Sequence, residues 1–349
     1  GALTLYAIRA PSLRGEGFFA PVSREGALVL NNLVLCTATA TVFFGTLYPL
    51  FLDAVGGGKI SVGPPYFNAT FGPLMMALLL LVPLGPFLAW KRADLAGVVQ
   101  RVWVAALAAA AIGAVAWWMH GGGPLLALFG VALAAWLVLG AFAEVAERIA
   151  LFRAPAATVW SRARNLPRSA WGMTIAHAGV GIVMAGLVGL TAWTSEDIRV
   201  VRPGDRIEIA GHRLTFQGVS RTEGPNYIAD VGRFRLESSG EILLPEKRIY
   251  PVAGTNTTEA AIRTTGFGDL YVVLGDAYPD GGWAVRIYDK PLAPWLWGGA
   301  VIMTLGGLVS LADRRYRVGA PTRGRKTRPA GRPAPAARAP IDTGATGTG

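Results

Sequence analysis

Of the three histidines in the chain, His177 alone lies inside an apolar segment long enough to cross a membrane. Because an ionisable side chain is costly to bury in hydrocarbon, an intramembrane histidine is a functional-site hypothesis in its own right. A neutral imidazole nitrogen can bind haem iron as an axial ligand. It can equally donate a hydrogen bond to a neighbouring helix. The residues around His177 do not decide between these two interpretations.

Small residues follow His177 along one face of the predicted helix. Gly181, Ala185 and Gly189 stand four, eight and twelve residues after it, and 3.6 residues per turn bring them close to one line. Such a flat strip accepts either the edge of a haem or a closely packed helix. Gly181 is therefore a subsidiary candidate for the surroundings of a cofactor.

The other two histidines are predicted to lie at different depths. His177 stands seven residues into its segment, roughly 10 Å from the cytoplasmic boundary at 1.5 Å per residue. His120 follows another apolar segment and is predicted to be a solvated loop residue, on the order of 15–20 Å away across a ~30 Å hydrocarbon core. His212 follows a turn and is predicted to be an ordinary strand residue. If His177 shares a haem with a second histidine, that histidine is not in this chain.

Two asparagines stand at about the depth of His177. Asn31 and Asn32 lie four and five residues into the first apolar segment. Hydrogen bonding between helices is the more common role of such residues. The sharper hypothesis places them beside a bound cofactor, with Arg24 near its propionates.

Composition indicates an integral membrane protein. The 349 residues are 52% hydrophobic and 16% charged, with a mean hydropathy of +0.41, which is too apolar for an ordinary soluble protein. Much of the net charge of +11 lies in short segments that flank apolar runs, as the positive-inside rule describes. No nucleic-acid-binding motif accompanies it. Cys36 is the only cysteine, so neither an internal disulfide nor a CxxC site can form.

Apolar runs predict about six transmembrane helices. They are Ala27–Phe51, Phe71–Trp90, Val102–Met119, Pro124–Val145, Ala170–Trp193 and Leu292–Leu311. Lys and Arg cluster before the first run, between the second and third, between the fourth and fifth, and after the sixth. Both ends of the chain are therefore expected in the cytoplasm.

These runs predict the domain organisation as well. Residues 1–193 are expected to form a transmembrane bundle, and 292–313 the final transmembrane helix. Residues 1–8 resemble the end of a preceding helix, which suggests a piece of a longer protein. Residues 314–349 are rich in Arg, Pro, Ala and Gly and are predicted to be a disordered, basic cytoplasmic tail.

A polar insert, residues 194–291, separates the last two predicted helices and is expected outside the cytoplasm. Alternating runs at 205–209 and 212–216 flank the turn Ala210-Gly211. Pro279-Asp-Gly-Gly is a further hairpin signal. About a hundred residues suffice for a core, so we predict a small antiparallel β domain, either a barrel or a sandwich.

Short stretches spread in order from about residue 20 to 317 resemble the CcmF/NrfE-type cytochrome c biogenesis proteins, the haem lyase membrane subunits, in their C-terminal half. They include Ser-Arg-Glu-Gly-Ala-Leu-Val-Leu-Asn-Asn at 23–32, Gly-Thr-Leu-Tyr-Pro at 45–49, Lys-Ile-Ser-Val-Gly-Pro-Pro-Tyr-Phe-Asn at 59–68, and residues 171–179, 223–226, 246–262, 269–271 and 282–291. The combination is specific, although no single stretch is.

The resemblance implies a multi-pass protein of the bacterial inner membrane with a periplasmic β domain. Such proteins carry a haem b in the membrane, held by two histidines. His177, in the context Ala-His-Ala-Gly, matches one of them, and the other is expected in the N-terminal half. The implied partners are that N-terminal half, a haem chaperone of the CcmE type, CcmH/CcmI-type subunits, apocytochrome c and membrane lipids, and not nucleic acid.

The expected function is to support the reduction and covalent attachment of haem to apocytochrome c. No catalytic residue is assigned, because no Ser/His/Asp or Cys/His grouping or carboxylate cluster suggests hydrolysis. This chain without its N-terminal half is not expected to attach haem, since it lacks a Trp-rich run. The alternative is a transporter or scaffold subunit without haem, in which His177 is a packing residue.

Overall fold

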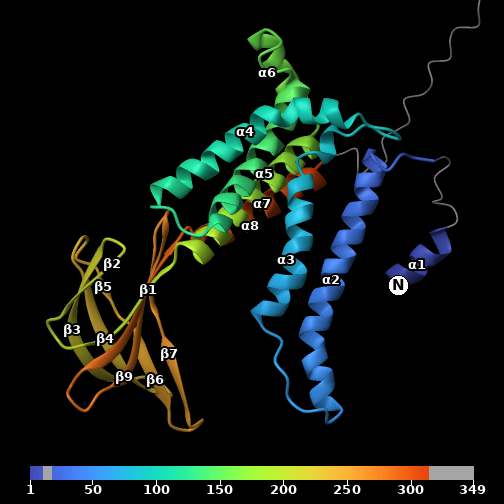
Figure 1. The fold of residues 1–349 in the computed structure, drawn as a ribbon. Helices are drawn as coiled ribbons and strands as arrows, with labels where there is room; N and C mark the ends of the chain where they lie inside the picture. Colours follow the sequence, from blue (N-terminus) through green and yellow to red (C-terminus); the bar gives the residue numbers. More distant parts are fainter. Residues whose placement is uncertain (11–17, 314–349) are drawn as a thin grey trace, which may run out of the picture.

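The computed structural model describes residues 1–10 and 18–313 (Figure 1). The helices are α1 (Ala2–Arg9), α2 (Arg24–Ala54), α3 (Pro64–Leu81), the 3-10 helix η2 (Gly85–Phe87), α4 (Leu95–Met119), α5 (Leu125–Ile149), α6 (Ala156–Arg164), α7 (Arg168–Ala192) and α8 (Pro294–Leu311). A β domain separates α7 from α8. The predicted tail, 314–349, lies outside the described residues.

Membrane-length helices confirm the predicted fold class. In the described part of the chain, α2, α4, α5, α7 and α8 are long and apolar enough to cross a membrane. The run expected at 71–90 differs, because α3 ends at Leu81. Pro83 and Pro86 lack the N–H that would continue the helix, and the chain turns into η2. With 18 residues, α3 is about 27 Å long, and a sixth crossing stays a prediction.

Glycines bring α7 and α8 into backbone contact. An added Cβ at Gly172 would lie 2.5 Å from the Gly306 carbonyl oxygen, and one at Gly299 would lie 2.8 Å from the Gly179 carbonyl oxygen. Gly186 continues the row against Leu296. The three α7 glycines are seven residues apart, so they share one face of the helix. This face, Gly172, Gly179 and Gly186, is called the glycine face below.

A second face of α7 packs against α5. An added Cβ at Gly181 would lie 2.7 Å from the Ala134 carbonyl oxygen, and one at Gly130 would lie 2.5 Å from Val188. On the far side of α5, Gly113 of α4 approaches Ala132 in the same way. Figure 1 shows α4, α5, α7 and α8 grouped together, with α2 and α3 as a pair beside them. Contacts with α8 on one face and with α5 on another thus fix the rotation of α7 about its own axis.

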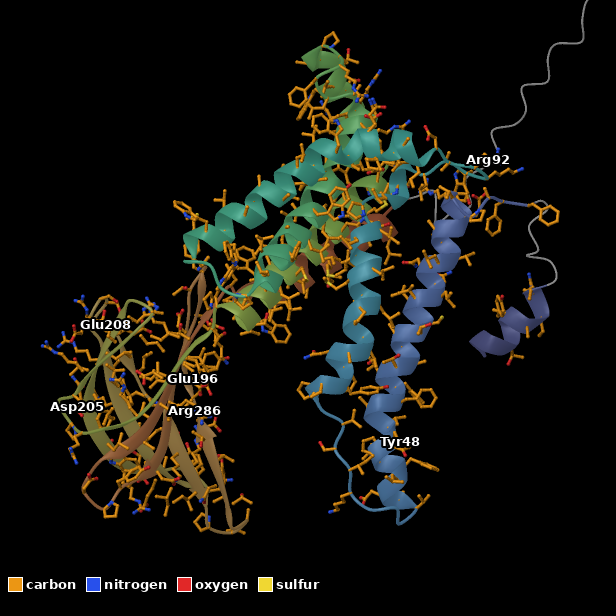
Figure 2. All side chains as sticks on the ribbon, viewed as in Figure 1. Tyr48, Arg92, Glu196, Asp205, Glu208 and Arg286 are labelled. Carbon is orange, nitrogen blue, oxygen red and sulfur yellow. The ribbon has the colours of Figure 1, made fainter. Side chains whose placement is uncertain are left out.

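The α2–α3 pair is antiparallel and tightly packed at one point. Gly45 of α2 lies against the rings of Tyr66 and Phe67, and the Tyr66 hydroxyl donates to the Thr41 carbonyl at 3.0 Å. Much of the remaining α2 surface is apolar and exposed, as at Leu33 (62%) and Phe44 (63%). Figure 2 shows Tyr48 near the C-terminal end of α2 and Arg92 close to its N-terminal end, away from the β domain.

The β domain is a sandwich of two antiparallel sheets, which decides between the two predicted architectures. The strands are β1 (Ser195–Val201), β2 (Arg206–Ile209), β3 (His212–Glu223), β4 (Ile228–Leu236), β5 (Ile242–Leu243), β6 (Glu246–Tyr250), β7 (Thr255–Glu259), β8 (Ala261–Thr264), β9 (Gly268–Ala277) and β10 (Trp283–Pro291). One sheet has the order β1-β10-β9-β8, and the other β2-β3-β4-β6-β7 with β5 beside β4.

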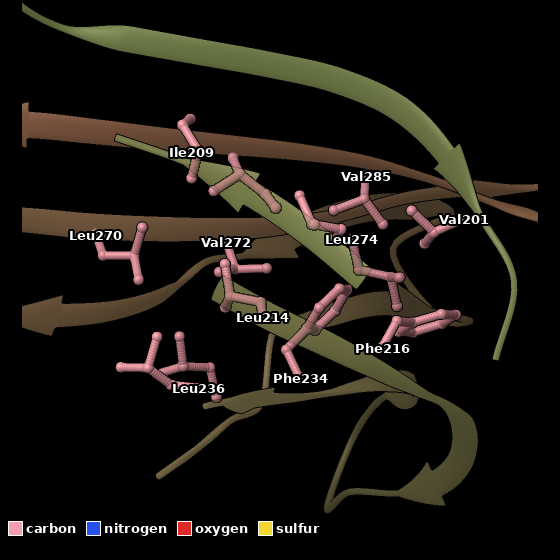
Figure 3. Close-up of a cluster of buried hydrophobic side chains, with 13 residues drawn as sticks. Val201, Ile209, Leu214, Phe216, Phe234, Leu236, Leu270, Val272, Leu274 and Val285 are labelled. Atoms are coloured by element: carbon pink, nitrogen blue, oxygen red, sulfur yellow. The ribbon is translucent and has the colours of Figure 1, made fainter. Parts of the chain in front are cut away.

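Alternating side chains build the sandwich core. Phe216 and Phe234 face each other across β3 and β4 with ring centroids 4.8 Å apart, and Leu274 and Ile287 face them from the other sheet. Figure 3 shows these apolar side chains converging between the sheets. The predicted turns at Ala210-Gly211 and Pro279–Gly282 are confirmed, because they join β2 to β3 and β9 to β10. Charged side chains such as Glu208 and Arg286 lie outside this core (Figure 2).

Two adjacent strands connect the sandwich to the helices. β1 follows α7, β10 precedes α8, and the two pair along their length from Ser195 opposite Asp289. At this junction an added Cβ at Gly189 would lie 2.5 Å from the Pro291 carbonyl oxygen. The two chain segments that pack as α7 and α8 therefore stay adjacent as β1 and β10, and these two contacts together determine the position of the sandwich.

We expect Gly306→Val to destabilise the helical region strongly. The new Cβ would meet the Ala176 nitrogen at 2.5 Å, and backbone atoms cannot move aside as a flexible side chain can. Overpacking of this kind costs about 1–3 kcal/mol or more. Thermal unfolding in detergent measures the loss. Gly307→Val is the matched control, since nothing lies within 4 Å of a Cβ at Gly307. Equal melting temperatures for the two variants would contradict the close α7–α8 packing.

Candidate functional site

A cavity of about 450 Å³ lies where α2, α3 and α7 meet, and His177 lines it. Its walls come from the chain before α2 and the first turns of α2, from the end of α3 with the turn that follows, and from α7. Its apolar lining includes Leu30, Val34, Leu78, Leu81, Leu88 and Met173. Its polar lining comes from Ser23, Arg24, Asn31 and His177. The site is thus a mostly apolar space with a few convergent polar groups, which is typical of ligand sites.

His177 reaches the cavity because of the way α7 is rotated. At 3.6 residues per turn, each residue advances about 100° around the helix axis, so Gly179 lies about 200° from His177. With the glycine face against α8, His177 is directed to the opposite side. Met173, one turn before His177, lines the same cavity. The packing of α7 on α8 therefore positions the imidazole.

Backbone hydrogen bonds hold the start of α2 at the cavity. The Ala20 N–H donates to the Lys91 carbonyl at 2.8 Å, and the Arg24 N–H donates to the Ala89 carbonyl at 2.9 Å. Ser23 caps α2, since its hydroxyl accepts from the Gly26 N–H at 3.0 Å. The two backbone bonds join residues 71 and 65 positions apart in sequence and give the cavity a defined edge.

Arg24 places a positive charge at that edge. Its guanidinium carbon stands 5.1 Å from the ring centroid of Trp90, a cation–π contact that orients the side chain. A guanidinium binds carboxylates well because its donors match their geometry. Arg24 can therefore receive an anionic group of a molecule in the cavity.

The four sequence candidates are only partly brought together. His177 and Asn31 line the cavity, and Arg24 lies beside them. Asn32 does not line it, although its side-chain oxygen accepts from the Asn31 amide at 3.3 Å. Gly181 faces α5 instead, against Ala134. Consecutive residues on a helix point about 100° apart, and here Leu30 and Asn31 face the cavity while Asn32 points away from it.

Sequence reasoning missed Met173 and Ser23. Met173 stands four residues before His177, on the same helical face, and this spacing was the available signal. Ser23 is only 1% exposed, and its position before an apolar helix is typical of an N-cap. The turn at 82–88 had no comparable signal, because its approach to α2 depends on tertiary structure.

The other two histidines lie away from the cavity. The His120 ring stacks on Trp193 with centroids 4.1 Å apart and an interplanar angle of 14°. His212 lies at the start of β3, with its Nε2 3.5 Å from Oδ1 of Asp289. Among the residues 1–10 and 18–313, no group of three or more His, Cys, Asp or Glu side chains could hold a metal ion. A haem iron needs only axial ligands from the protein.

Comparison with known proteins identifies the type of chain. Residues 192–291 match the family model described as the CcmF C-terminal beta-sandwich. The cytochrome c-type biogenesis protein CycK of Rhizobium meliloti is 50% identical over 93% of this chain and 49% of its own length. CcmF of Escherichia coli is 35% identical over 91% of this chain and 48% of its own. A solved structure, the cytochrome c heme lyase CcmF, aligns with a TM-score of 0.65 and 25% identity, over 84% of this chain and 46% of that one.

These findings support a CcmF-type cytochrome c biogenesis protein. The resemblance seen in its sequence is thereby confirmed. The five membrane-length helices and this similarity support a multi-pass inner-membrane protein. The chain spans about half the length of the curated CcmF-type relatives it matches.

Two carboxyls of the sandwich are expected to give opposite pH dependences. Burial raises the pKa of Asp289, and the nearby His212 opposes this only in part. The stability that Asp289 contributes is therefore full below its ordinary pKa and falls as pH rises through the higher folded value. The N–H of Gly282 and the guanidinium of Arg202 lower the pKa of Asp280. Its contribution is present above the ordinary pKa and is lost as pH falls.

We accordingly expect Asp289→Asn to raise the melting temperature of the sandwich at neutral pH, and to do so more than at pH 4. Asp280→Asn is the matched variant and should lower the melting temperature at neutral pH, and should do so more than at pH 4. Thermal unfolding followed by circular dichroism across this pH range measures both. The same direction of change in the two variants would refute the assignment.

Proposed function

We propose that this chain supplies His177 as one axial ligand of a transmembrane haem b, within a membrane haem lyase that attaches haem to apocytochrome c. One observation carries the proposal. His177, Asn31 and Arg24, from helices far apart in sequence, converge on one largely apolar cavity of about 450 Å³. The similarity to cytochrome c biogenesis proteins supports it.

The residues at the cavity fit the chemical needs of a haem. A haem b requires an imidazole for its iron, apolar walls for the macrocycle and a cation for its propionates. His177, the leucines of α2 and α3, and Arg24 meet these needs in turn. The Asn31 amide can donate a hydrogen bond to a polar group at the same edge.

The second axial ligand is proposed to come from outside this chain. Neither His120 nor His212 lines the cavity, so a second histidine must approach from the open side. Exposed apolar side chains of α2, such as Leu33 and Phe44, provide a surface on which the N-terminal half of the protein could pack. A bis-histidine haem in this apolar site would supply electron transfer, which would serve to keep the haem to be attached in its ferrous state.

The same proposal includes sidedness and partners. The arginine-rich ends of the helices face the cytoplasm by the positive-inside rule, and the sandwich is then periplasmic. On that side it is available to a haem chaperone of the CcmE type, CcmH/CcmI-type subunits and apocytochrome c. No residue of this chain is assigned a catalytic role.

We expect His177→Ala to abolish haem binding by the intact protein, because the iron loses an axial ligand. A pyridine haemochrome assay of the purified protein measures the haem content. His120→Ala and His212→Ala are matched controls and should retain haem, since neither residue reaches the cavity. Unchanged haem content in His177→Ala would refute the ligand role, whereas absence of haem from the unaltered protein would favour a transporter or scaffold subunit.

Arg24→Gln is expected to lower the reduction potential of the haem while much of the haem is retained. Removing a positive charge near the propionates favours the ferric state, which carries the greater positive charge. Redox titration of the haem absorbance measures the potential. Arg92→Gln removes a charge from the same end of the helices (Figure 2) but not from the cavity lining, and should leave the potential unchanged. Equal reduction potentials in both variants would show that the charge of Arg24 does not act on the haem.

A further inference from the structure

The turn between β8 and β9 presents an exposed aromatic side chain on a rigid support. Phe267 is 84% exposed, although it belongs to a well-ordered turn. The Thr265 N–H donates to the Gly268 carbonyl at 2.9 Å, and the Thr265 hydroxyl accepts from the Phe267 and Gly268 N–H groups, each at 3.2 Å. These bonds fix the backbone of the turn and leave the Phe267 ring exposed.

Hydrogen bonds fasten this turn to the first turn of α8. The Leu292 N–H donates to the Phe267 carbonyl at 2.7 Å, and the Trp295 indole N–H donates to the Gly266 carbonyl at 2.8 Å. An added Cβ at Gly268 would lie 2.8 Å from the Lys290 carbonyl oxygen, which shows how closely the two segments approach. Phe267 is therefore held at the level where α8 begins.

The start of α8 marks a membrane boundary. α8 is an 18-residue apolar helix of membrane-spanning composition, and Trp295 and Trp297 lie in its first turn, with Trp297 78% exposed. Tryptophans at the end of a spanning helix favour the headgroup region. Phe267 extends this aromatic level from the helix to the β domain.

A cation, Lys290, lies one residue pair farther along the β9–β10 ladder from α8. Lys290 pairs in register with Asp269, next to the pair of Pro291 and Gly268. Its amine lies 4.0 Å from the ring centroid of Tyr271. An aromatic side chain at the apolar boundary with a lysine just outside it is the arrangement that suits lipid acyl chains and phosphates.

We propose that the β8–β9 turn is a lipid anchor, with Phe267 inserted at the boundary between headgroups and acyl chains. The anchor adds a third attachment to the two strand–helix connections of the sandwich and restricts its tilt over the membrane. It rests on α8 crossing the membrane and is independent of haem binding and of the side on which the sandwich lies.

Site-directed spin labelling tests the anchor. Phe267→Cys, in the intact protein with Cys36→Ser and no other cysteine, is labelled and reconstituted into vesicles of phosphatidylethanolamine and phosphatidylglycerol. Collision of the label with oxygen, which concentrates in lipid, is compared with collision with a water-soluble nickel chelate. Val252→Cys is the matched control. Val252 is fully exposed and belongs to the turn between β6 and β7. Figure 1 shows β6 and β7 extending to the end of the sandwich that is remote from α7 and α8.

We expect the ratio of oxygen to nickel collisions to be several-fold higher at position 267 than at 252. Equal ratios would place the turn in water and overturn the proposal. Low collision rates with both reagents at 267 would overturn it as well, because they would show that protein covers the ring. Both substituted side chains are exposed, so neither variant removes a core contact.

Discussion

The backbone contact between α7 and α8 determines the rotation of α7, and the candidate site depends on that rotation. Glycine lets two helices approach until their backbones touch, which no larger residue permits. In this chain the glycine face lies against Gly299 and Gly306, and α5 packs on a neighbouring face. His177 is left on the side where neither helix packs, facing the cavity. A helix turned by even one residue would direct the imidazole elsewhere, by about 100°.

The cavity is assembled from segments that are distant in sequence. The start of α2 is bonded to the chain after η2, and α7 contributes His177 and Met173 from the other side. Arg24 is the first residue of α2 and Asn31 lies about two turns later, so a charge and an amide reach the space at different depths. The proposed haem site would be a shared one, completed by a second ligand from outside this chain.

The contact between α7 and α8 positions the β sandwich as well as the candidate site. β1 and β10 continue directly from α7 and into α8, so the contact that rotates α7 also places the sandwich. Gly189 against Pro291 extends the close packing into the junction. A rigid link of this kind keeps the β domain in a constant position relative to the helices.

Apolar runs in the sequence were enough to predict α2, α4, α5, α7 and α8, because burial in lipid requires length and hydrophobicity. Alternation and turn residues were enough to predict an antiparallel β domain. The intramembrane histidine indicated a residue that lines the cavity, and its ligand role stays a prediction. The run at 71–90 misled, since apolar composition continues through prolines that end the helix. Tertiary packing alone decided three orientations. It determined that Asn31 and not Asn32 faces the cavity, which α7 glycines contact α8, and that Gly181 contacts α5. The physical reason is that composition determines whether a helix forms, whereas contacts with its neighbours determine which way it faces.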